Sequence, residues 1–131
     1  MILDASALIA LLEEEPEAEE VERRLNTSKS VSVGAPTLVE TAMVLAGRVR
    51  GDPSALIAEF LHDSNVAVIP FTEEHYRVAV QAFLRYGKGR HPAGLNMGDC
   101  LSYATAKLAG VPLLYVGNDF EKTDLAWKGY S

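Results

Sequence analysis

Short apolar runs alternate along this chain with longer segments in which apolar residues recur at helical spacing. Four of the runs are too short to be ordinary helices, and a helical segment lies between each one and the next. Strands that are separated by helices in this way are typical of a parallel sheet with helices on both of its faces. The sequence therefore predicts an α/β fold, a three-layer α/β/α sandwich around a parallel sheet.

Prolines, glycines and capping residues mark where these elements begin and end. The strands are expected at residues 1–3, 30–33, 66–71 and 113–116. The helices are expected at residues 6–15, 16–28, 36–50, 53–65, 72–87 and 98–110. Three of the helices open on a proline, which suits the first helical turn. Thr72 is the expected N-cap of the fifth helix, and Gly110 is expected to end the sixth.

The length and composition indicate one folded domain that comprises residues 1–131. The chain is 48% apolar, which is enough to build a core, and no apolar run reaches the roughly 18 residues of a membrane span. Its first residues lack the basic stretch of a signal peptide. The single cysteine, Cys100, excludes an intramolecular disulfide and a cysteine-rich zinc site. We expect a cytoplasmic protein that does not associate with membranes.

The net charge of −6 argues by itself against nucleic-acid binding, because lysine and arginine supply most of the affinity for phosphate. However, seven of the eighteen acidic residues lie in one run, Glu13 to Glu22, which is typical of a solvated helical surface. The rest of the chain is nearly neutral. Its basic residues Arg85, Lys88 and Arg90 gather in the segment RYGKGRHPAGLN. The overall charge therefore leaves a nucleic-acid substrate open.

Two of the predicted strands lead directly into acidic residues. Asp4 follows the first strand, and Asp119 follows the last one after Gly117 and Asn118. Ligands of open parallel sheets bind outside the carboxyl ends of the strands. Both carboxylates are therefore expected at the edge of the sheet where a ligand would bind.

Two further carboxylates have neighbours that are unusual for a solvated charge. Glu40 lies early in its helix between Val39 and Thr41, and Asp99 opens a helix directly after Gly98. Both helices begin at the same edge of the sheet, so four carboxylates would gather in one region and repel each other. A divalent cation would relieve this repulsion. Carboxylate oxygens suit Mg²⁺ or Mn²⁺, and no cluster of Cys or His suggests zinc.

Each of these acids also has a purely structural interpretation. Asp4 could cap the first helix, and Glu40 could be an acid stabilised by the dipole of its helix. Asp99 lies three residues after Asn96 and could complete a capping box, while Asp119 could belong to an ordinary turn. Their shared position at one edge of the sheet favours a metal site. His75, in the first turn of its helix, is expected at the surface.

Three segments carry a resemblance to a known family. ILDASALIALL, PTLVETAMVL and LNMGDCLSYATAKLAGVPLLYVGNDFEKTDL resemble, in order and spacing, the successive motifs of PIN-domain ribonucleases, in particular the VapC-type toxins of prokaryotic toxin–antitoxin pairs. The resemblance covers essentially the whole chain and implies a parallel α/β/α sandwich. It also implies that four residues form the metal site, with Ser6 at the small hydroxyl position beside it: Asp4, Glu40, Asp99 and Asp119.

The resemblance implies a Mg²⁺- or Mn²⁺-dependent endoribonuclease, the toxin of a type II toxin–antitoxin system. We expect Asp4 and Asp99 to hold the metal, with Glu40 and Asp119 acting directly or through water, and Ser6 to orient a ligand or water. The metal would activate water for cleavage of an RNA phosphodiester bond. The basic residues Arg85, Lys88 and Arg90, with Lys122, are expected to form a rim for the RNA.

The expected partners are the RNA substrate, a cognate antitoxin and a second copy of the chain. The antitoxin would cover the groove and insert an Arg or Lys among the carboxylates. The homodimer is expected to form through the helices at 36–50 and 53–65, whose apolar residues Met43, Ile57 and Phe60 exceed what one core-facing stripe needs.

Other functions for an α/β domain of this size fit less well. A phosphoacceptor receiver needs adjacent acids after its first strand and an aspartate at the end of its third, but here Asp4 stands alone and the third strand ends in IPFT. An Asp-x-Asp phosphatase fails because Ser6 replaces the second aspartate. The remaining alternative is a non-catalytic PIN-like module that only binds a partner protein. Such a module would have little reason to keep four clustered carboxylates.

Overall fold

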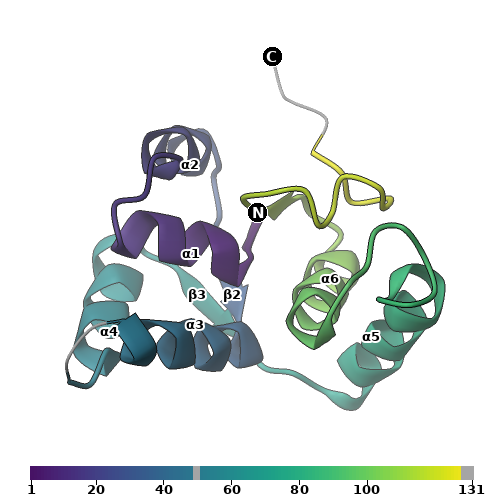
Figure 1. Ribbon diagram of the computed structural model, residues 1–131. Coiled ribbons are helices and arrows are strands. Elements are labelled where there is room, and N and C mark those ends of the chain that lie inside the picture. The colour runs from purple at the N-terminus through teal and green to yellow at the C-terminus, as the bar shows by residue number, and fades with distance from the viewer. Residues whose placement is uncertain (49–50, 128–131) are drawn as a thin grey trace.

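The computed structural model describes residues 1–48 and 51–127 and contains one four-stranded parallel sheet (Figure 1). Its strands are β1 (Ile2–Leu3), β2 (Ser32–Gly34), β3 (Ala67–Ile69) and β4 (Leu113–Leu114). The strand order is β3-β2-β1-β4. All four strands overlap the predicted positions and each is shorter than expected, but β2 ends one residue later than predicted, at Gly34.

The helices also follow the predicted order. They are α1 (Ala5–Leu12), α2 (Ala18–Asn26), α3 (Ala35–Arg48), α4 (Ser54–Asp63), α5 (Glu73–Tyr86) and α6 (Met97–Ala109). Gly110, in the left-handed conformation, ends α6 as expected. The predicted extension of the third helix to residue 50 lies outside the described residues.

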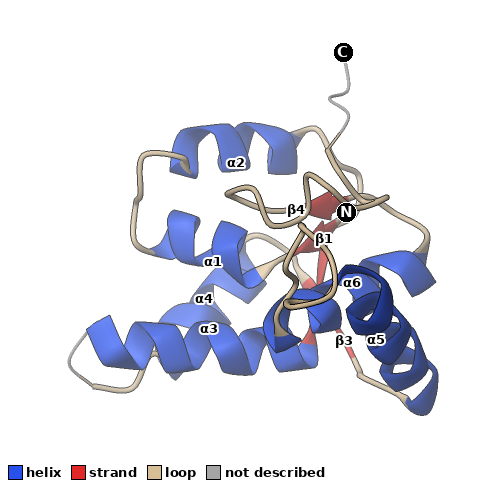
Figure 2. Cartoon of the chain, turned by 45° about the vertical axis from the view of Figure 1, so that its right-hand side comes forward, coloured by secondary structure: helices blue, strands red, loops and turns tan. Residues whose placement is uncertain are grey.

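Successive residues of the strands point to opposite faces of the sheet and build two apolar clusters. Ile2 and Leu113 pack with α5, α6 and the segment after β4, whereas Leu3 and Leu114 pack with α1 and with apolar side chains of α2 and α4. Figure 2 shows the strands between these two groups of helices. The expected three-layer α/β/α sandwich is therefore confirmed.

The position of β1 inside the sheet explains where a site can form. The chain adds β2 and then β3 on one side of β1 and afterwards returns to add β4 on the other side. The order of the strands thus reverses at β1, and the carboxyl end of such a strand is where ligands of open α/β sheets bind. Asp4 follows this strand directly.

The N-terminus of α5 corrects one expectation from the sequence. Thr72 caps the helix as predicted, but His75 is buried rather than exposed at the surface. The Nδ1 atom of His75 accepts a hydrogen bond from the backbone N–H of Thr72 at 3.1 Å and lies 2.8 Å from its hydroxyl. The ring therefore completes a capping box, a role in which glutamate or glutamine is more usual.

The helices that were expected to form a dimer interface bury part of their apolar surface within the chain. Ile57 is buried and so is not available for the interface as predicted, whereas Phe60 packs against the cluster around Leu3 and is only partly buried. Both face inward because α4 covers one face of the sheet. Met43 on α3 is 71% exposed and remains available. None of the described helices is both long enough and apolar enough to cross a membrane.

Candidate metal centre

Asp4 links the ends of two neighbouring strands. It is the N-cap of α1, and its Oδ2 atom accepts hydrogen bonds from the backbone N–H of Ser6 at 3.1 Å and from the Ser6 hydroxyl at 2.6 Å. The same hydroxyl accepts a hydrogen bond from the N–H of Val116, just beyond β4, at 2.9 Å. Ser6 therefore connects the carboxylate after β1 to the backbone after β4.

Asp99 is held in the first turn of α6. Its Oδ2 atom accepts a hydrogen bond from the backbone N–H of Asn96 at 3.0 Å, while the side chain of Asn96 accepts one from the N–H of Asp99 at 2.9 Å. This is a capping box in which both partners are satisfied. The side chain of Asp99 is only 8% exposed. The capping box fixes a buried carboxylate at the start of a helix.

Glu40 reaches the same helix terminus from α3. Its carboxylate lies against the backbone of Gly98, so closely that a Cβ atom at position 98 would lie 2.6 Å from its Oε1 atom and 2.7 Å from its Cδ. Glu40 itself is partly buried. The N-terminal parts of α3 and α6 thus lie close together, with the carboxylate of Glu40 packed between them.

Asp119 approaches from the loop after β4. This loop turns at Gly117, whose φ of +98° is a conformation that L side chains rarely adopt. Asp119 is exposed, unlike Asp4 and Asp99. It is nevertheless close enough for its charge to act on the carboxyl group of Asp99.

The carboxyl group of Asp99 is subject to the charges of the other three acids. Burial raises the pKa of Asp99, and the charges of Asp119, Asp4 and Glu40 raise it further, to about 7, against the opposing hydrogen bond from Asn96. Burial, followed by the charge of Asp4, also raises the pKa of Glu40. The fold therefore brings all four predicted carboxylates into one region and holds them there against their mutual repulsion.

The structural interpretations of Asp4 and Asp99 are correct as local descriptions. Both residues do cap helices, but capping alone does not explain why four carboxylates share a partly buried region. In residues 1–48 and 51–127, no three His, Cys, Asp or Glu side chains stand close enough together to hold a metal ion. The four carboxylates therefore act on one another through their charges but do not form a ready-made metal cage.

This arrangement fits a hard divalent cation. All the donors are carboxylate oxygens, and the raised pKa of Asp99 reveals negative charge that a cation would neutralise. Mg²⁺ usually keeps several of its waters and is bound by one or two carboxylates plus the phosphates of a substrate, so it needs no all-protein cage. The residues present therefore suit Mg²⁺ or Mn²⁺.

The basic residues predicted as a rim lie partly in the loop between α5 and α6. Lys88 and Arg90 are exposed there, and the guanidinium of Arg90 lies 5.7 Å from the ring centroid of Phe83. Arg85 lies over the ring of Tyr86 at 4.7 Å, and its charge also acts on Asp124. The backbone N–H of Lys88 donates to the carbonyl of Leu95 at 3.0 Å, which ties this loop to the residues just before α6.

Several contacts that hold the segment after β4 were not foreseen from the sequence. Tyr103 donates to one oxygen of Asp124 at 2.8 Å, and Lys107 contacts its other oxygen at 2.6 Å. The hydroxyl of Tyr115 donates to Glu121 and accepts from the backbone of Trp127. These bonds anchor the segment that begins with Asp119. No local pattern identifies them, because each joins residues distant in the chain or in an irregular segment.

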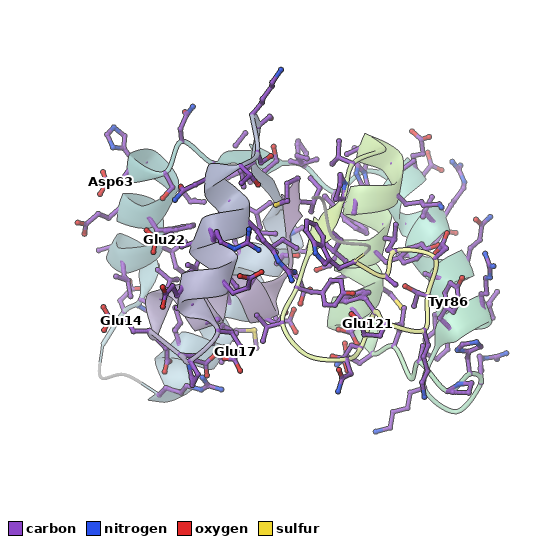
Figure 3. The ribbon with its side chains drawn as sticks, turned by 90° about the horizontal axis from the view of Figure 1, so that it is seen from above. Glu14, Glu17, Glu22, Asp63, Tyr86 and Glu121 are labelled. Carbon is purple, nitrogen blue, oxygen red and sulfur yellow. The ribbon has the colours of Figure 1, made fainter. Side chains whose placement is uncertain are left out.

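The acidic run of the sequence occupies a different part of the molecule. Figure 3 shows Glu14, Glu17 and Glu22 with Asp63 over the part formed by α1, α2 and α4, and Tyr86 at the opposite end. Glu20 in this run is exposed and pairs with Arg23 and Arg24. The prediction of a solvated helical surface is correct for Glu19, Glu20 and Glu22 on α2, but the other four glutamates of the run lie in the turn between α1 and α2, outside any helix.

Comparison with known proteins identifies relatives of this chain. Residues 1–125 match the family model of the PIN domain. The chain is 47% identical to the ribonuclease VapC36 of Mycobacterium tuberculosis, in a match that covers 98% of this chain and 94% of that protein. It is 42% identical to a ribonuclease VapC of Mycolicibacterium smegmatis, over 96% of this chain and 98% of that protein.

Solved structures of toxins share the fold. One is the Mycobacterium tuberculosis toxin VapC20, which cleaves the sarcin–ricin loop; its TM-score is 0.71 at 22% identity, over 92% of both chains. Another belongs to a toxin–antitoxin complex from Klebsiella pneumoniae, with a TM-score of 0.71 at 20% identity, over 98% of this chain and 97% of that one. At these identities the likeness concerns the fold.

Proposed function

Because the chain belongs to the PIN domain family and is a ribonuclease of the VapC type, the toxin of a toxin–antitoxin pair, we propose that it cleaves RNA with the help of a divalent metal ion. The metal is Mg²⁺ or Mn²⁺. One domain, residues 1–131, carries the activity, and the RNA substrate places the protein in the cytoplasm. The observation that carries the proposal is the buried carboxyl group of Asp99 among three other carboxylates.

The four carboxylates have distinct roles in this proposal. Asp4 and Asp99 are the principal ligands, since hydrogen bonds fix both side chains before a metal arrives. Glu40 and Asp119 complete the site directly or through water. A bound divalent cation lowers the pKa of a coordinated water and stabilises negative charge on the phosphate.

The chain's own residues prepare this site. Ser6 orients the carboxylate of Asp4 through its 2.6 Å hydrogen bond and ties it to β4 through Val116. Asn96 orients Asp99 in the same way. With a pKa of about 7, the carboxyl group of Asp99 is about half protonated at neutral pH, so metal binding releases a proton from it. Cleavage is therefore expected to rise with pH through this range.

The direct test is cleavage of a structured RNA before and after EDTA treatment. EDTA should abolish cleavage, and added Mg²⁺ or Mn²⁺ in excess of the chelator should restore it. An Asp99→Asn preparation serves as a control for contaminating nucleases. Equal cleavage with and without EDTA would refute the metal-dependent mechanism.

The substrate must bind a protein whose net charge is −6. Lys88 and Arg90, with Arg85 and Lys122, provide a local positive rim, and the metal adds positive charge at the centre of the site. The acidic run in the turn before α2 and on α2 itself lies on another part of the molecule, which supports an approach of the RNA over the loop between α5 and α6.

A cognate antitoxin is the second partner in this proposal. An Arg or Lys side chain inserted among the four carboxylates would satisfy their charge in place of the metal. Expression of the chain alone should slow the growth of its host, and co-expression with the small protein encoded beside it should restore growth. Absence of toxicity would argue against the role as a toxin but not against the ribonuclease activity.

We also propose that the chain forms a homodimer, in which exposed apolar side chains of two helices take part. On α3 these are Val39 and Met43, one turn apart; on α5 they are Tyr76, Val80 and Leu84, which share one face. Light scattering at micromolar concentrations should give twice the monomer mass, and Met43→Lys with Val80→Lys should reduce it. A monomer in the unmodified protein would contradict this proposal.

A further inference from the structure

Gly98 occupies a position in α6 where glycine is otherwise unfavourable. It is the second residue of the helix, between Met97 and Asp99. Its backbone is not among those with positive φ, so the conformation itself does not require glycine. Alanine is generally the better helix former in such a position. A reason for glycine must therefore lie in what surrounds it.

The carboxylate of Glu40 supplies that reason. A Cβ atom on Gly98 would meet both oxygens and the carboxyl carbon of Glu40, at distances well below van der Waals contact. The first turn of α6 can therefore lie close to α3 only because Gly98 has no side chain where the carboxylate of Glu40 packs. The N-terminal turn of a helix also attracts a carboxylate, because its N–H groups and the positive end of the helix dipole face outward there.

We infer that Gly98 is a positioning residue, which lets the carboxylate of Glu40 reach the metal site beside Asp99. The inference rests on the proposed metal-dependent function. The atoms that a Cβ would strike belong to the end of a flexible side chain and not to backbone. A methyl group at position 98 should consequently displace Glu40 while the fold stays intact. Loss of metal binding without loss of folding is the expected signature.

The chain contains a matched control. Gly47 also lies within a helix, α3, but a Cβ atom there would meet nothing within 4 Å. Gly47→Ala therefore makes the same chemical change in open space. Both alanine variants should fold with a melting temperature at or above that of the unmodified protein.

Calorimetric titration with Mn²⁺ of the metal-free protein tests the inference. Gly98→Ala should weaken Mn²⁺ binding roughly tenfold, the scale on which residues that orient metal ligands act, whereas Gly47→Ala should leave it unchanged. In a Glu40→Ala background, Gly98→Ala should cause no further loss, because no carboxylate remains to be displaced. A crystal structure of metal-free Gly98→Ala should show Glu40 moved away from α6.

The outcomes separate this inference from the proposed function. Unchanged Mn²⁺ affinity in Gly98→Ala would overturn the role of Gly98 and leave the metal site standing. An equal loss in the Glu40→Ala background would also overturn it, since Gly98 would then act by another route. An unfolded Gly98→Ala variant would do the same, because Glu40 and not the fold must give way. An unmodified protein that binds no Mn²⁺ would overturn the proposed metal site and this inference together.

Discussion

The carboxylates of this molecule exist in two opposite states. Asp99 is buried among other acids, and the pKa of its carboxyl group is raised by that burial and by its neighbours to about 7. Glu20 on α2 is exposed, and hydrogen bonds from Arg23 and Arg24 lower its pKa to about 2. The difference teaches that the position of an acid in the fold, and not its abundance in the sequence, decides whether its charge can do chemistry.

The acidic run and the four site carboxylates also differ in how their negative charge is balanced. In the acidic run around α2, Glu20 pairs with Arg23 and Arg24, and Glu13 and Glu15 lie within 4 Å of Arg48, so arginine charges offset part of its negative charge. In the described residues, no arginine or lysine forms an ion pair with any of the four site acids. Repulsion between these acids therefore persists in the folded protein, as the raised pKa values of Glu40 and Asp99 indicate. Such stored repulsion is what a bound cation would release. Four changes test this comparison.

The largest effect is expected from Asp99→Asn. Asparagine keeps the shape of the side chain and can still accept the hydrogen bond from Asn96, but it lacks the charge that holds a cation. Cleavage of RNA should fall by about a thousandfold or more, as when a group essential to catalysis is removed, while circular dichroism stays unchanged. Retained turnover with normal Mn²⁺ binding would show that Asp99 only caps α6.

Next in size is the pH dependence of stability in the metal-free protein. The pKa of Asp99 is about 7 in the folded chain and near its ordinary value of 3.8 when unfolded. Between these values the folded state holds a proton that the unfolded state has lost. The free energy of unfolding should therefore fall as pH rises from 5 to 8, by roughly 2 kcal/mol from this group.

Urea unfolding in EDTA at both pH values measures this effect. Asp99→Asn should remove the greater part of the pH dependence and should be more stable than the unmodified chain at pH 8. A pH dependence that persists undiminished in Asp99→Asn would mean that this carboxyl group is not repelled by its neighbours.

A smaller effect is expected from reversing the charge of the basic loop. Lys88→Glu with Arg90→Glu should weaken binding of single-stranded RNA about tenfold and lower its salt dependence by roughly one to two units of slope. Lys29→Glu is the matched control, because Lys29 is exposed but precedes β2 and so lies toward the opposite edge of the sheet. Equal losses in both variants would mean that RNA binding follows net charge alone.

The fold and the four acids were open to prediction because both depend on local patterns. Alternating apolar runs and helices determine a parallel sheet, and a sheet of this kind brings Asp4, Glu40, Asp99 and Asp119 to one edge. The contact between Glu40 and Gly98 depends instead on how closely α3 approaches α6, which no spacing in the sequence encodes.

The wrong predictions concern side chains that the sequence places at the surface but that the fold buries. His75 has the position of a surface residue in the first turn of α5, yet its ring replaces the usual acid of a capping box and is buried. Ile57 is expected from the sequence at a dimer interface, yet it is buried within the chain. In each case packing between elements, rather than propensity within one element, decides the outcome.

The smallest effect should come from the acidic run itself. Glu20→Gln removes the charge between Arg23 and Arg24, but all three side chains can be rehydrated at the surface of α2. The urea midpoint of unfolding should not shift measurably, because exposed ion pairs contribute little to stability, and RNA cleavage should not change. Urea unfolding and a cleavage assay beside Asp99→Asn make the contrast direct. If Glu20→Gln altered cleavage as Asp99→Asn does, the division between solvated and catalytic carboxylates would be wrong.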